Sequence, residues 1–234
     1  SPVSGNKYFK LKYNILKALE NRNDTIVTFG GAYSNHILAT SIISKKENIK
    51  CIGYIRGEKT LPLNPTLNDA INNGMQIRYI SRKEYKRINN EDYLNCLKQK
   101  HKNSYIIPEG GTNKLAVKGA ELIINSDDNF QFICCPIGTG GTISGIINSS
   151  SEKQQIIGFS SIKGVKKILD DIHLFTNKNN WKINEDYCLG GYAKVSPKLI
   201  NFIYDFYENK NIALDAVYTA KMMMGIIDLV LKNN

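Results

Sequence analysis

A lysine that could act as a reactive amine lies near the start of the chain, in the segment Ser4-Gly5-Asn6-Lys7-Tyr8-Phe9-Lys10-Leu11. A Ser-Gly-Asn turn precedes Lys7, and a helical pattern begins at about this residue. A lysine fixed at such a junction, close to helix amides, can react as an amine instead of remaining a solvated surface charge. Because Asn-Lys pairs are common in a Lys- and Asn-rich chain, this meaning depends on partner chemistry elsewhere in the sequence.

Glycines and threonines form a candidate anion site at 138–142, Gly-Thr-Gly-Gly-Thr, between an apolar run and an expected helix. Glycines allow backbone amides to approach an anion closely, and a helix N-terminus adds partial positive charge, so the pattern predicts a bound phosphate group. Ile143 stands where a dinucleotide-binding turn would have its third glycine, and the Gly-Lys-Ser/Thr of a P-loop is missing. The alternative is a tight connection that binds no ligand.

A second strand-to-helix turn, Gly30-Gly31-Ala32-Tyr33-Ser34-Asn35-His36, ends in three side chains that form hydrogen bonds. These residues suit either a binding site or an ordinary helix cap with His36 at the surface, and the segment alone gives both interpretations equal weight. We expect no metal site here, because His101 and His173 are the other histidines and no acidic cluster stands at ligand spacing.

The segment 214–222, Leu-Asp-Ala-Val-Tyr-Thr-Ala-Lys-Met, is expected to form a short buried strand that leads into the last helix. Its methionines are typical of core filling. Taken alone, Lys221 is expected to be a surface charge in the first turn of that helix.

Strands and helices are expected to alternate along most of the chain and so to position these candidates. Apolar runs predict strands over 25–29, 51–55, 76–80, 105–107 and 130–137. Helical patterns predict helices over 10–20, from 34 or 35 to 43, 64–73, 91–100, 114–124, from 142 onward, 197–207 and 219–232. Such alternation indicates an α/β fold with parallel sheets covered by helices, and binding sites in these folds lie at the carboxyl ends of strands. Both glycine-rich turns stand at such ends.

Composition excludes several classes of protein. The 234 residues suffice for one or two domains, and an apolar content of 42% is that of a globular protein. The net charge of +10 comes from lysines spread along the chain, so we expect no nucleic-acid partner. We expect neither a membrane span nor a secretory signal. Five cysteines without C-x-x-C spacing predict reduced thiols and a cytoplasmic protein.

Six motifs of this chain, in the same order, resemble those of one enzyme family. They are Ser-Gly-Asn-Lys at 4–7 with Lys10-Leu11, the turn 30–36, Pro-Glu-Gly-Gly-Thr-Asn at 108–113, the turn 138–142, Gly-Gly-Tyr-Ala-Lys at 190–194 and Val-Tyr-Thr-Ala-Lys at 217–221. Over almost its whole length the chain resembles the 1-aminocyclopropane-1-carboxylate deaminase / D-cysteine desulfhydrase family. The resemblance implies pyridoxal-phosphate fold type II, the tryptophan-synthase-β-like fold. Family members usually carry a substantial segment before the first motif, where this sequence has three residues.

The resemblance implies that pyridoxal 5'-phosphate is the cofactor. Lys7 would bond to it covalently and, once displaced by the substrate amine, act as the catalytic base for the Cα proton. Asn35 would lie beside the pyridine ring, and Lys10 would be a second cation near the phosphate. The remaining cofactor-binding residues that the resemblance implies are Gly138, Thr139, Gly140, Gly141, Thr142 and Thr219.

The same resemblance implies a small amino acid as the substrate. Ser34, with the neighbouring amides of Asn35 and His36, would receive the substrate carboxylate and act on the substrate. Tyr218 and, less directly, Tyr192 would be pocket tyrosines near the reacting carbons, with Tyr218 catalytic.

Thr219 favours one reaction of the family over another. Members that open the cyclopropane ring resemble one another in having glutamate here, where a carboxylate keeps the pyridine nitrogen protonated. A threonine hydroxyl is a weaker partner, which suits β-elimination of a good leaving group. We therefore expect D-cysteine or a similar substrate to give pyruvate, ammonia and hydrogen sulfide. The alternatives are ring opening to 2-oxobutyrate and ammonia, and a non-catalytic relative that only binds the cofactor.

The resemblance also implies two domains and a homodimer. Residues 1–20 and 105–234 are expected to form a larger cofactor-binding domain, and residues 21–104 a smaller substrate domain that carries Ser34.

Overall fold

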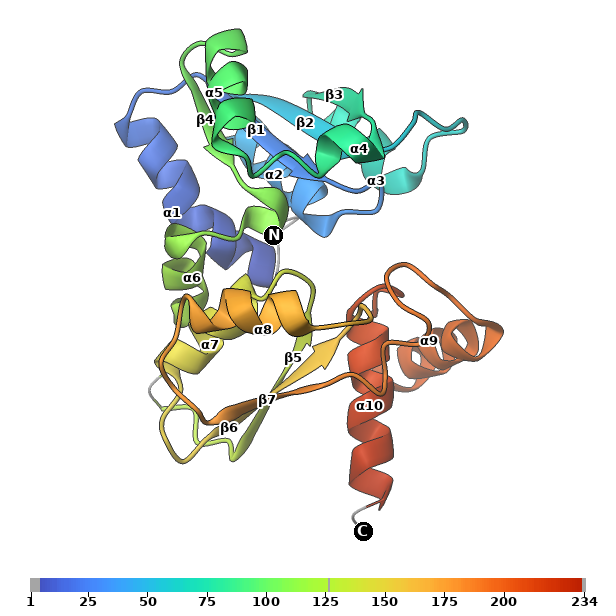
Figure 1. Ribbon diagram of the computed structural model, residues 1–234. Helices are drawn as coiled ribbons and strands as arrows, with labels where there is room; N and C mark the ends of the chain where they lie inside the picture. Colours follow the sequence, from blue (N-terminus) through green and yellow to red (C-terminus); the bar gives the residue numbers. More distant parts are fainter. Residues whose placement is uncertain (1–4, 126, 233–234) are drawn as a thin grey trace. The chain divides into compact units, whose positions relative to one another are not determined.

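The computed structural model describes residues 5–125 and 127–232, so Ser4 of the first motif lies outside the described residues. The chain divides into two compact units, Ser1–Gly119 (unit 1) and Ala120–Asn234 (unit 2), each with one parallel sheet (Figure 1). The predicted α/β fold with parallel sheets covered by helices is confirmed. The helix α1 (Asn6–Glu20) packs against α2 and β4 within unit 1, and the expected assignment of residues 1–20 and 105–234 to one domain stays a prediction.

Unit 1 is built on four parallel strands in the order β3-β2-β1-β4. The strands are β1 (Thr25–Gly30), β2 (Lys50–Arg56), β3 (Met75–Ile80) and β4 (Ser104–Ile107). The central strand β1 is buried along its whole length, which explains its continuous apolar run, since a parallel strand is covered on both faces. The four strands expected in this part of the sequence are confirmed.

Helices cover both faces of this sheet, because successive side chains of a strand point to opposite faces. Ile26 of β1 packs in one core with Leu11 and Ile37, whereas its neighbour Val27 packs in another with Leu97. The helices of unit 1 are α1, α2 (Asn35–Lys46), α3 (Pro65–Asn72), α4 (Arg82–Tyr85), α5 (Glu91–Lys100), the 3-10 turn η1 (Glu109–Gly111) and α6 (Lys114–Ala120). Thus α1, α2 and α3 line one face, and α4 and α5 the other.

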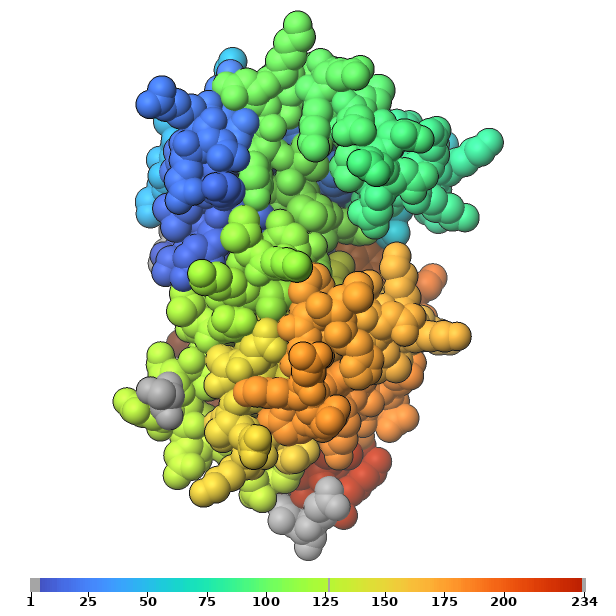
Figure 2. All heavy atoms as spheres, turned by 60° about the vertical axis from the view of Figure 1, so that its left-hand side comes forward, coloured from blue at the N-terminus to red at the C-terminus, as the bar shows by residue number. Residues whose placement is uncertain are grey.

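Unit 2 holds three parallel strands in the order β5-β6-β7, namely β5 (Phe132–Ile137), β6 (Gln155–Ser160) and β7 (Trp181–Asn184). Ile137 and Ile156 pack with Ile143 of α7 (Gly141–Ser149) and Ile168 of α8 (Lys166–His173) on one face. Residues in and around α8, orange in the space-filling view, cover the outside of this packed layer (Figure 2). The other face receives α10 (Thr219–Lys232), which also packs against α9 (Pro197–Lys210).

Two expectations about unit 2 require correction. Residues 214–215 have no regular structure and residues 216–218 form a turn, not a buried strand, because the Asp215 carboxylate accepts hydrogen bonds from the backbone amides of Val217, Tyr218 and Thr219. These amides are satisfied by a helix cap, so they need no neighbouring strand. The expected helix 114–124 ends at Ala120 and continues as the 3-10 turn η2 (Glu121–Ile123).

Candidate functional site

Lys7 lies in the first turn of α1, which begins at Asn6 as the sequence predicts. Gly5 is the N-cap residue and has a φ of 75°, a left-handed value that glycine adopts without steric cost. The side chain of Lys7 is half-buried. The fold therefore fixes this lysine at a helix start, as expected, and its role towards a cofactor stays a prediction.

Lys10 lies one turn further along α1 and is buried, with 1% of its surface exposed. Its Nζ donates hydrogen bonds to the backbone oxygen of Gly110 at 2.7 Å and to Oγ1 of Thr112 at 2.9 Å. These bonds to uncharged oxygens offset part of the cost of burying an ammonium group. The segment 108–113 is thereby fastened to the helix that carries Lys7. The predicted contact of Lys10 with a phosphate stays a prediction.

Asparagines reinforce the same connection. Nδ2 of Asn113 donates to Oδ1 of Asn14 at 2.7 Å, and Nδ2 of Asn14 donates to Oδ1 of Asn113 at 3.2 Å. Oδ1 of Asn113 also accepts the amide of Ala116 at the start of α6. The Pro-Glu-Gly-Gly-Thr-Asn motif, which the sequence offered only as part of a resemblance, is thus a loop held against α1.

Ser34 is the N-cap of α2, and its Oγ accepts the amide of Ile37 at 3.3 Å. The preceding Gly30 has no room for a side chain, because a Cβ there would lie 2.5 Å from Cγ1 of Ile37. The cap leaves the Ser34 hydroxyl proton to be donated elsewhere. Since a helix N-terminus attracts negative charge, the turn 34–36 suits a carboxylate.

His36 is buried with 1% exposure, so the interpretation that places it at the surface is wrong. Its Nε2 lies 2.7 Å from Oγ1 of Thr28, and that oxygen also donates to the backbone oxygen of Ile107 at 2.9 Å. Because a threonine hydroxyl has one proton, which goes to Ile107, the proton shared with His36 belongs to Nε2. The imidazole is therefore held as one neutral tautomer with a lone pair on Nδ1.

The Nδ1 atom of His36 is buried and has no hydrogen-bond partner among the described residues. A Cβ added at Gly111 would lie 3.2 Å from it, so the glycine gives the ring its space. Burial first, and then the charges of Lys7 and Lys10, hold the pKa of His36 well below its usual value. Unit 1 thus brings together a neutral imidazole and two lysines that affect its charge state.

The glycine-rich turn of unit 2 leads from β5 into α7. Gly140 is the N-cap with a φ of 77°, and no side chain caps the helix among the described residues. A Cβ at Gly138 would lie 3.1 Å from Cε1 of Tyr218, so a larger residue would meet this ring. Backbone amides at a helix start, with the hydroxyls of Thr139 and Thr142, form the kind of donor set that fits a phosphate group.

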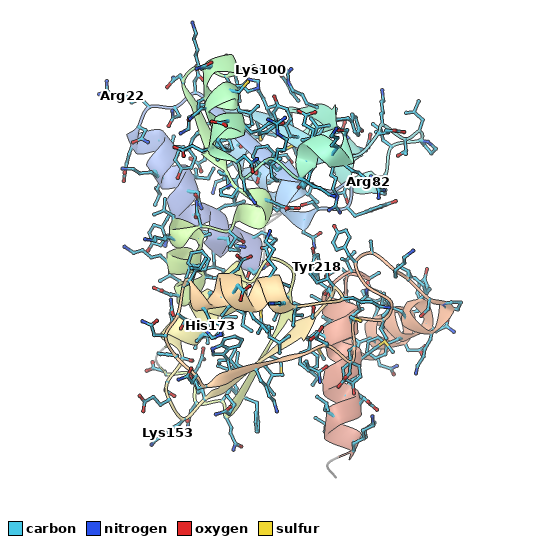
Figure 3. All side chains as sticks on the ribbon, viewed as in Figure 1. Arg22, Arg82, Lys100, Lys153, His173 and Tyr218 are labelled. Atoms are coloured by element: carbon cyan, nitrogen blue, oxygen red, sulfur yellow. The ribbon has the colours of Figure 1, made fainter. Side chains whose placement is uncertain are left out.

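Two tyrosines pack together in unit 2. The rings of Tyr192 and Tyr218 are 6.2 Å apart between centroids, at an interplanar angle of 65°. Tyr218 lies at the N-terminal end of α10 (Figure 3). The Tyr218 ring therefore packs against Tyr192 and lies where a side chain on Gly138 would extend. Three of the residues that the sequence predicts for the site, Gly138, Tyr192 and Tyr218, are thus close together.

Thr219 is bound to Asp215, a residue that the sequence did not single out. The Thr219 hydroxyl donates to Oδ2 of Asp215 at 2.8 Å, and the same carboxylate caps the first amides of α10. Since the single hydroxyl proton goes to a carboxylate, Oγ1 of Thr219 can offer any further partner only a lone pair. An aspartate four residues before the start of α10 at Thr219 is the cap signal that could have identified it.

Lys221 is buried with 1% exposure, so the expectation that it is a surface charge is wrong. Its Nζ donates to the backbone oxygens of Cys188 at 3.0 Å and Gly191 at 2.7 Å. Burial lowers the pKa of Lys221, and the charges of Cys188 and Asp215 oppose this shift. The position of Lys221 in the sequence, three residues after Tyr218, does not indicate that it binds this loop.

The predicted residues fall into two groups, with Lys7, Lys10 and Ser34–His36 in unit 1 and the turn 138–142, Tyr192, Tyr218 and Thr219 in unit 2. No group of three or more His, Cys, Asp or Glu side chains in the described part of the chain is placed to hold a metal ion. Within residues 5–125 and 127–232, none of the helices is long and apolar enough to cross a membrane.

Comparison with known proteins adds a relative that decides the family. The chain is 30% identical, over 97% of its length and 79% of the relative's, to a Thermotoga maritima protein provisionally named 1-aminocyclopropane-1-carboxylate deaminase. The chain belongs to the 1-aminocyclopropane-1-carboxylate deaminase / D-cysteine desulfhydrase family. It is also 31% identical to the bifunctional D-cysteine desulfhydrase/1-aminocyclopropane-1-carboxylate deaminase of Arabidopsis thaliana, covering 99% of this chain and 65% of that protein.

A solved structure of a homologue of 1-aminocyclopropane-1-carboxylate deaminase superposes with a TM-score of 0.77 at 25% identity, over 98% of this chain and 76% of that one. The fold of this family member is pyridoxal-phosphate fold type II, as the motifs imply. No family model matches the sequence.

Proposed function

We propose that this chain is a pyridoxal-phosphate-dependent lyase that deaminates a small amino acid, with D-cysteine or a similar amino acid as its substrate. The observation that supports this choice within the family is the Thr219–Asp215 arrangement. The Thr219 hydroxyl donates its proton to Asp215 and accepts the Asp215 amide, so towards a protonated ring nitrogen it would be a neutral acceptor, weaker than the carboxylate that ring-opening members carry. Elimination of a thiol from Cβ needs less carbanion stabilisation than ring opening, because the leaving group departs readily.

The residues present fit the cofactor. The start of α7, where no side chain caps Gly140 among the described residues, has backbone amides of the kind that bind a phosphate, and Gly138 leaves space beside the Tyr218 ring. In this proposal Lys7 would bond covalently to the cofactor, Asn35 would contact its ring, and Lys10 would add positive charge. When bound, the cofactor supplies the electron sink for breaking the Cα–H bond.

The chain's own groups bind the substrate and move its protons. The Ser34 hydroxyl and the amides of Asn35 and His36 hold the substrate carboxylate at the start of α2, where the helix dipole favours an anion. Lys7 would accept the Cα proton, and the proposal gives Tyr218 and Tyr192 the role of pocket tyrosines for the reacting carbons. D-Cysteine and water then yield pyruvate, ammonia and hydrogen sulfide, so no external oxidant or reductant is needed.

The assay that tests this proposal measures pyruvate and sulfide from D-cysteine in parallel with 2-oxobutyrate from 1-aminocyclopropane-1-carboxylate. We expect sulfide and pyruvate in equal amounts. Exclusive release of 2-oxobutyrate would instead support the second candidate, ring opening, the one activity in the name of the Thermotoga relative and one of the two activities in the name of the Arabidopsis relative.

Cofactor attachment has its own test. The full chain is mixed with pyridoxal 5'-phosphate, reduced with borohydride and digested, and mass spectrometry identifies the modified lysine. We expect the label on Lys7 and its loss in Lys7→Ala, with Lys12→Ala as the matched control on the same helix. Label on Lys10 would contradict the assignment, and a protein that binds the cofactor without any turnover would be the non-catalytic relative.

Assembly as a homodimer in the cytoplasm is part of the proposal, on the family resemblance alone. Light scattering of the purified chain, with an expected mass of twice 26.3 kDa, tests the dimer.

A further inference from the structure

The loop 188–194 of unit 2 has an unusual backbone. Leu189, Gly190, Gly191 and Ala193 have φ values of 46°, 88°, 111° and 55°. Glycine adopts such values freely, but Leu189 and Ala193 do so against the preference of L-residues. A loop with this conformation needs contacts outside itself to hold it in one arrangement.

Lys221 provides such contacts from the first turn of α10. Its buried ammonium donates to the backbone oxygens of Cys188 and Gly191, at opposite sides of the Leu189-Gly190 pair. Both acceptors are neutral carbonyls, so the bonds fix the loop backbone without forming an ion pair. Burying an ammonium for this purpose is costly, which sets the residue apart from ordinary surface lysines.

The contact joins two residues of the proposed pocket. Gly191 immediately precedes Tyr192, and Lys221 follows Tyr218 by one helical turn, so one side chain connects the two segments that carry the tyrosine pair. We propose that Lys221 is a positioning residue that holds the loop 188–194 and thereby places Tyr192 against Tyr218. The catalytic consequence rests on the proposed function, whereas the positioning itself does not.

Amide hydrogen exchange of the full chain, with pyridoxal 5'-phosphate in the buffer, tests the positioning. In Lys221→Met we expect the amides of 188–194 to exchange at least about tenfold faster, while β6 keeps its protection, because only the loop loses its anchor. Lys10→Met is the matched control: it removes the other buried lysine and should accelerate 109–113 but not 188–194. Unchanged exchange in the loop, or an equal rise throughout unit 2, would overturn the proposal.

If Lys221→Met does not fold, Lys221→Gln takes its place, since glutamine keeps an N–H donor on a shorter side chain. We expect an intermediate acceleration confined to 188–194, and wild-type protection in this variant would count against the proposal. Because exchange needs no turnover, a wild-type chain that neither eliminates sulfide nor binds the cofactor would contradict the proposed function and leave this result intact.

The link to the pocket is tested by a double-mutant cycle on kcat and KM for D-cysteine. If Lys221 acts through Tyr192, Lys221→Met should change both constants much less in a Tyr192→Phe background than in the wild type. Additive effects in the two backgrounds would show that Lys221 has a purely structural role.

Discussion

Each unit contains a lysine that is 99% buried and that fastens a glycine-containing loop to a helix. In unit 1, Lys10 binds Gly110 and Thr112, and in unit 2, Lys221 binds Cys188 and Gly191. Both lysines lie three residues after a predicted site residue: Lys10 follows Lys7 within α1, and Lys221 follows Tyr218, which immediately precedes α10. A buried ammonium on neutral oxygens is thus used twice to fix the helix turn that presents a functional side chain.

The two loops differ in what else holds them. In unit 1, Asn14 and Asn113 exchange two hydrogen bonds, and the hydroxyl of Tyr85 donates to Glu109 at 2.8 Å. The positive φ values of that loop fall on Gly110 and Gly111, where they cost little, whereas the loop of unit 2 places two non-glycine residues in the same region. We conclude that several side chains hold the loop of unit 1 against the helix that carries Lys7, whereas the loop of unit 2 is held by Lys221 and by the ring contact of Tyr192 with Tyr218.

The largest expected loss of stability follows from replacing a tightly packed glycine in each unit by alanine. A Cβ at Gly119 of α6 would overlap the backbone carbonyl oxygen of Phe9, which cannot move without shifting the helix that carries Lys7 and Lys10. Gly119→Ala should therefore destabilise the protein by about 3 kcal/mol, even after the higher helix propensity of alanine is counted. Urea unfolding measures this loss.

Gly158→Ala is the matched substitution in unit 2. Its Cβ would meet the flexible ends of the Ile137 and Ile143 side chains, which can shift, so we expect about 1–2 kcal/mol. A loss at Gly158 equal to or above that at Gly119 would mean that the packing of unit 1 is not the more rigid one.

The redundancy of the first loop is tested by its asparagines. Asn14 is fully buried and bonds Asn113, the backbone oxygen of Lys10 and the hydroxyl of Tyr105. Asn14→Ala leaves several of these groups unsatisfied and should cost about 2–3 kcal/mol. Because Asn113→Ala breaks the same pair, the two losses should be less than additive by at least about 0.5 kcal/mol, and strict additivity would disprove a shared network.

Protonation of His36 at low pH should destabilise unit 1. Burial, with Lys7 and Lys10 nearby, holds the pKa of His36 well below 6.5, so the unfolded chain binds a proton that the folded chain does not. The stability that depends on the neutral imidazole is complete above about pH 6.5 and falls below it by up to about 1.4 kcal/mol per pH unit. The free energy of unfolding, measured by chemical denaturation at several pH values between about 5 and 7.5, gives this slope.

His36→Gln should flatten that slope, because glutamine can donate to Thr28 and has no charge to gain. His101→Gln is the matched control. Burial first, and then Arg78 and Lys100, lower the pKa of His101, which lies in a less buried position and should contribute a smaller part of the slope. A slope that survives His36→Gln unchanged would contradict the assigned neutral state.

How far the sequence predicts these features depends on whether the cause is local. Apolar runs and caps such as Ser34 and Asn64 mark most elements of unit 1, because a strand or helix start is determined by neighbouring residues. The strands β6 and β7 were not expected, and their sheet pairing depends on residues distant along the chain.

In the candidate site, too, local features could be predicted from the sequence and long-range contacts could not. Lys7, Ser34 and the turn 138–142 stand out by spacing, so their local conformations were predicted correctly. The burial of Lys10, His36 and Lys221 was not, because each depends on contacts with loops 30 or more residues away or on a full strand layer. From sequence alone, a lysine in a helix is predicted to be a surface charge, because the distant loop that it binds is not known.

The smallest expected difference concerns the caps of the two helices that present site residues. In α2, the Ser34 hydroxyl accepts one amide at 3.3 Å, whereas the Asp215 carboxylate of α10 accepts three amides and the Thr219 hydroxyl. Removing a cap costs about 1 kcal/mol on average and up to about 2 for a strong one, so Ser34→Ala should cost the lower and Asp215→Ala the higher amount. Thermal unfolding of both variants measures the difference. If both caps cost the same, the charge of Asp215 adds nothing to its hydrogen bonds, and the orientation of the Thr219 hydroxyl, which rests on that carboxylate, loses its physical basis.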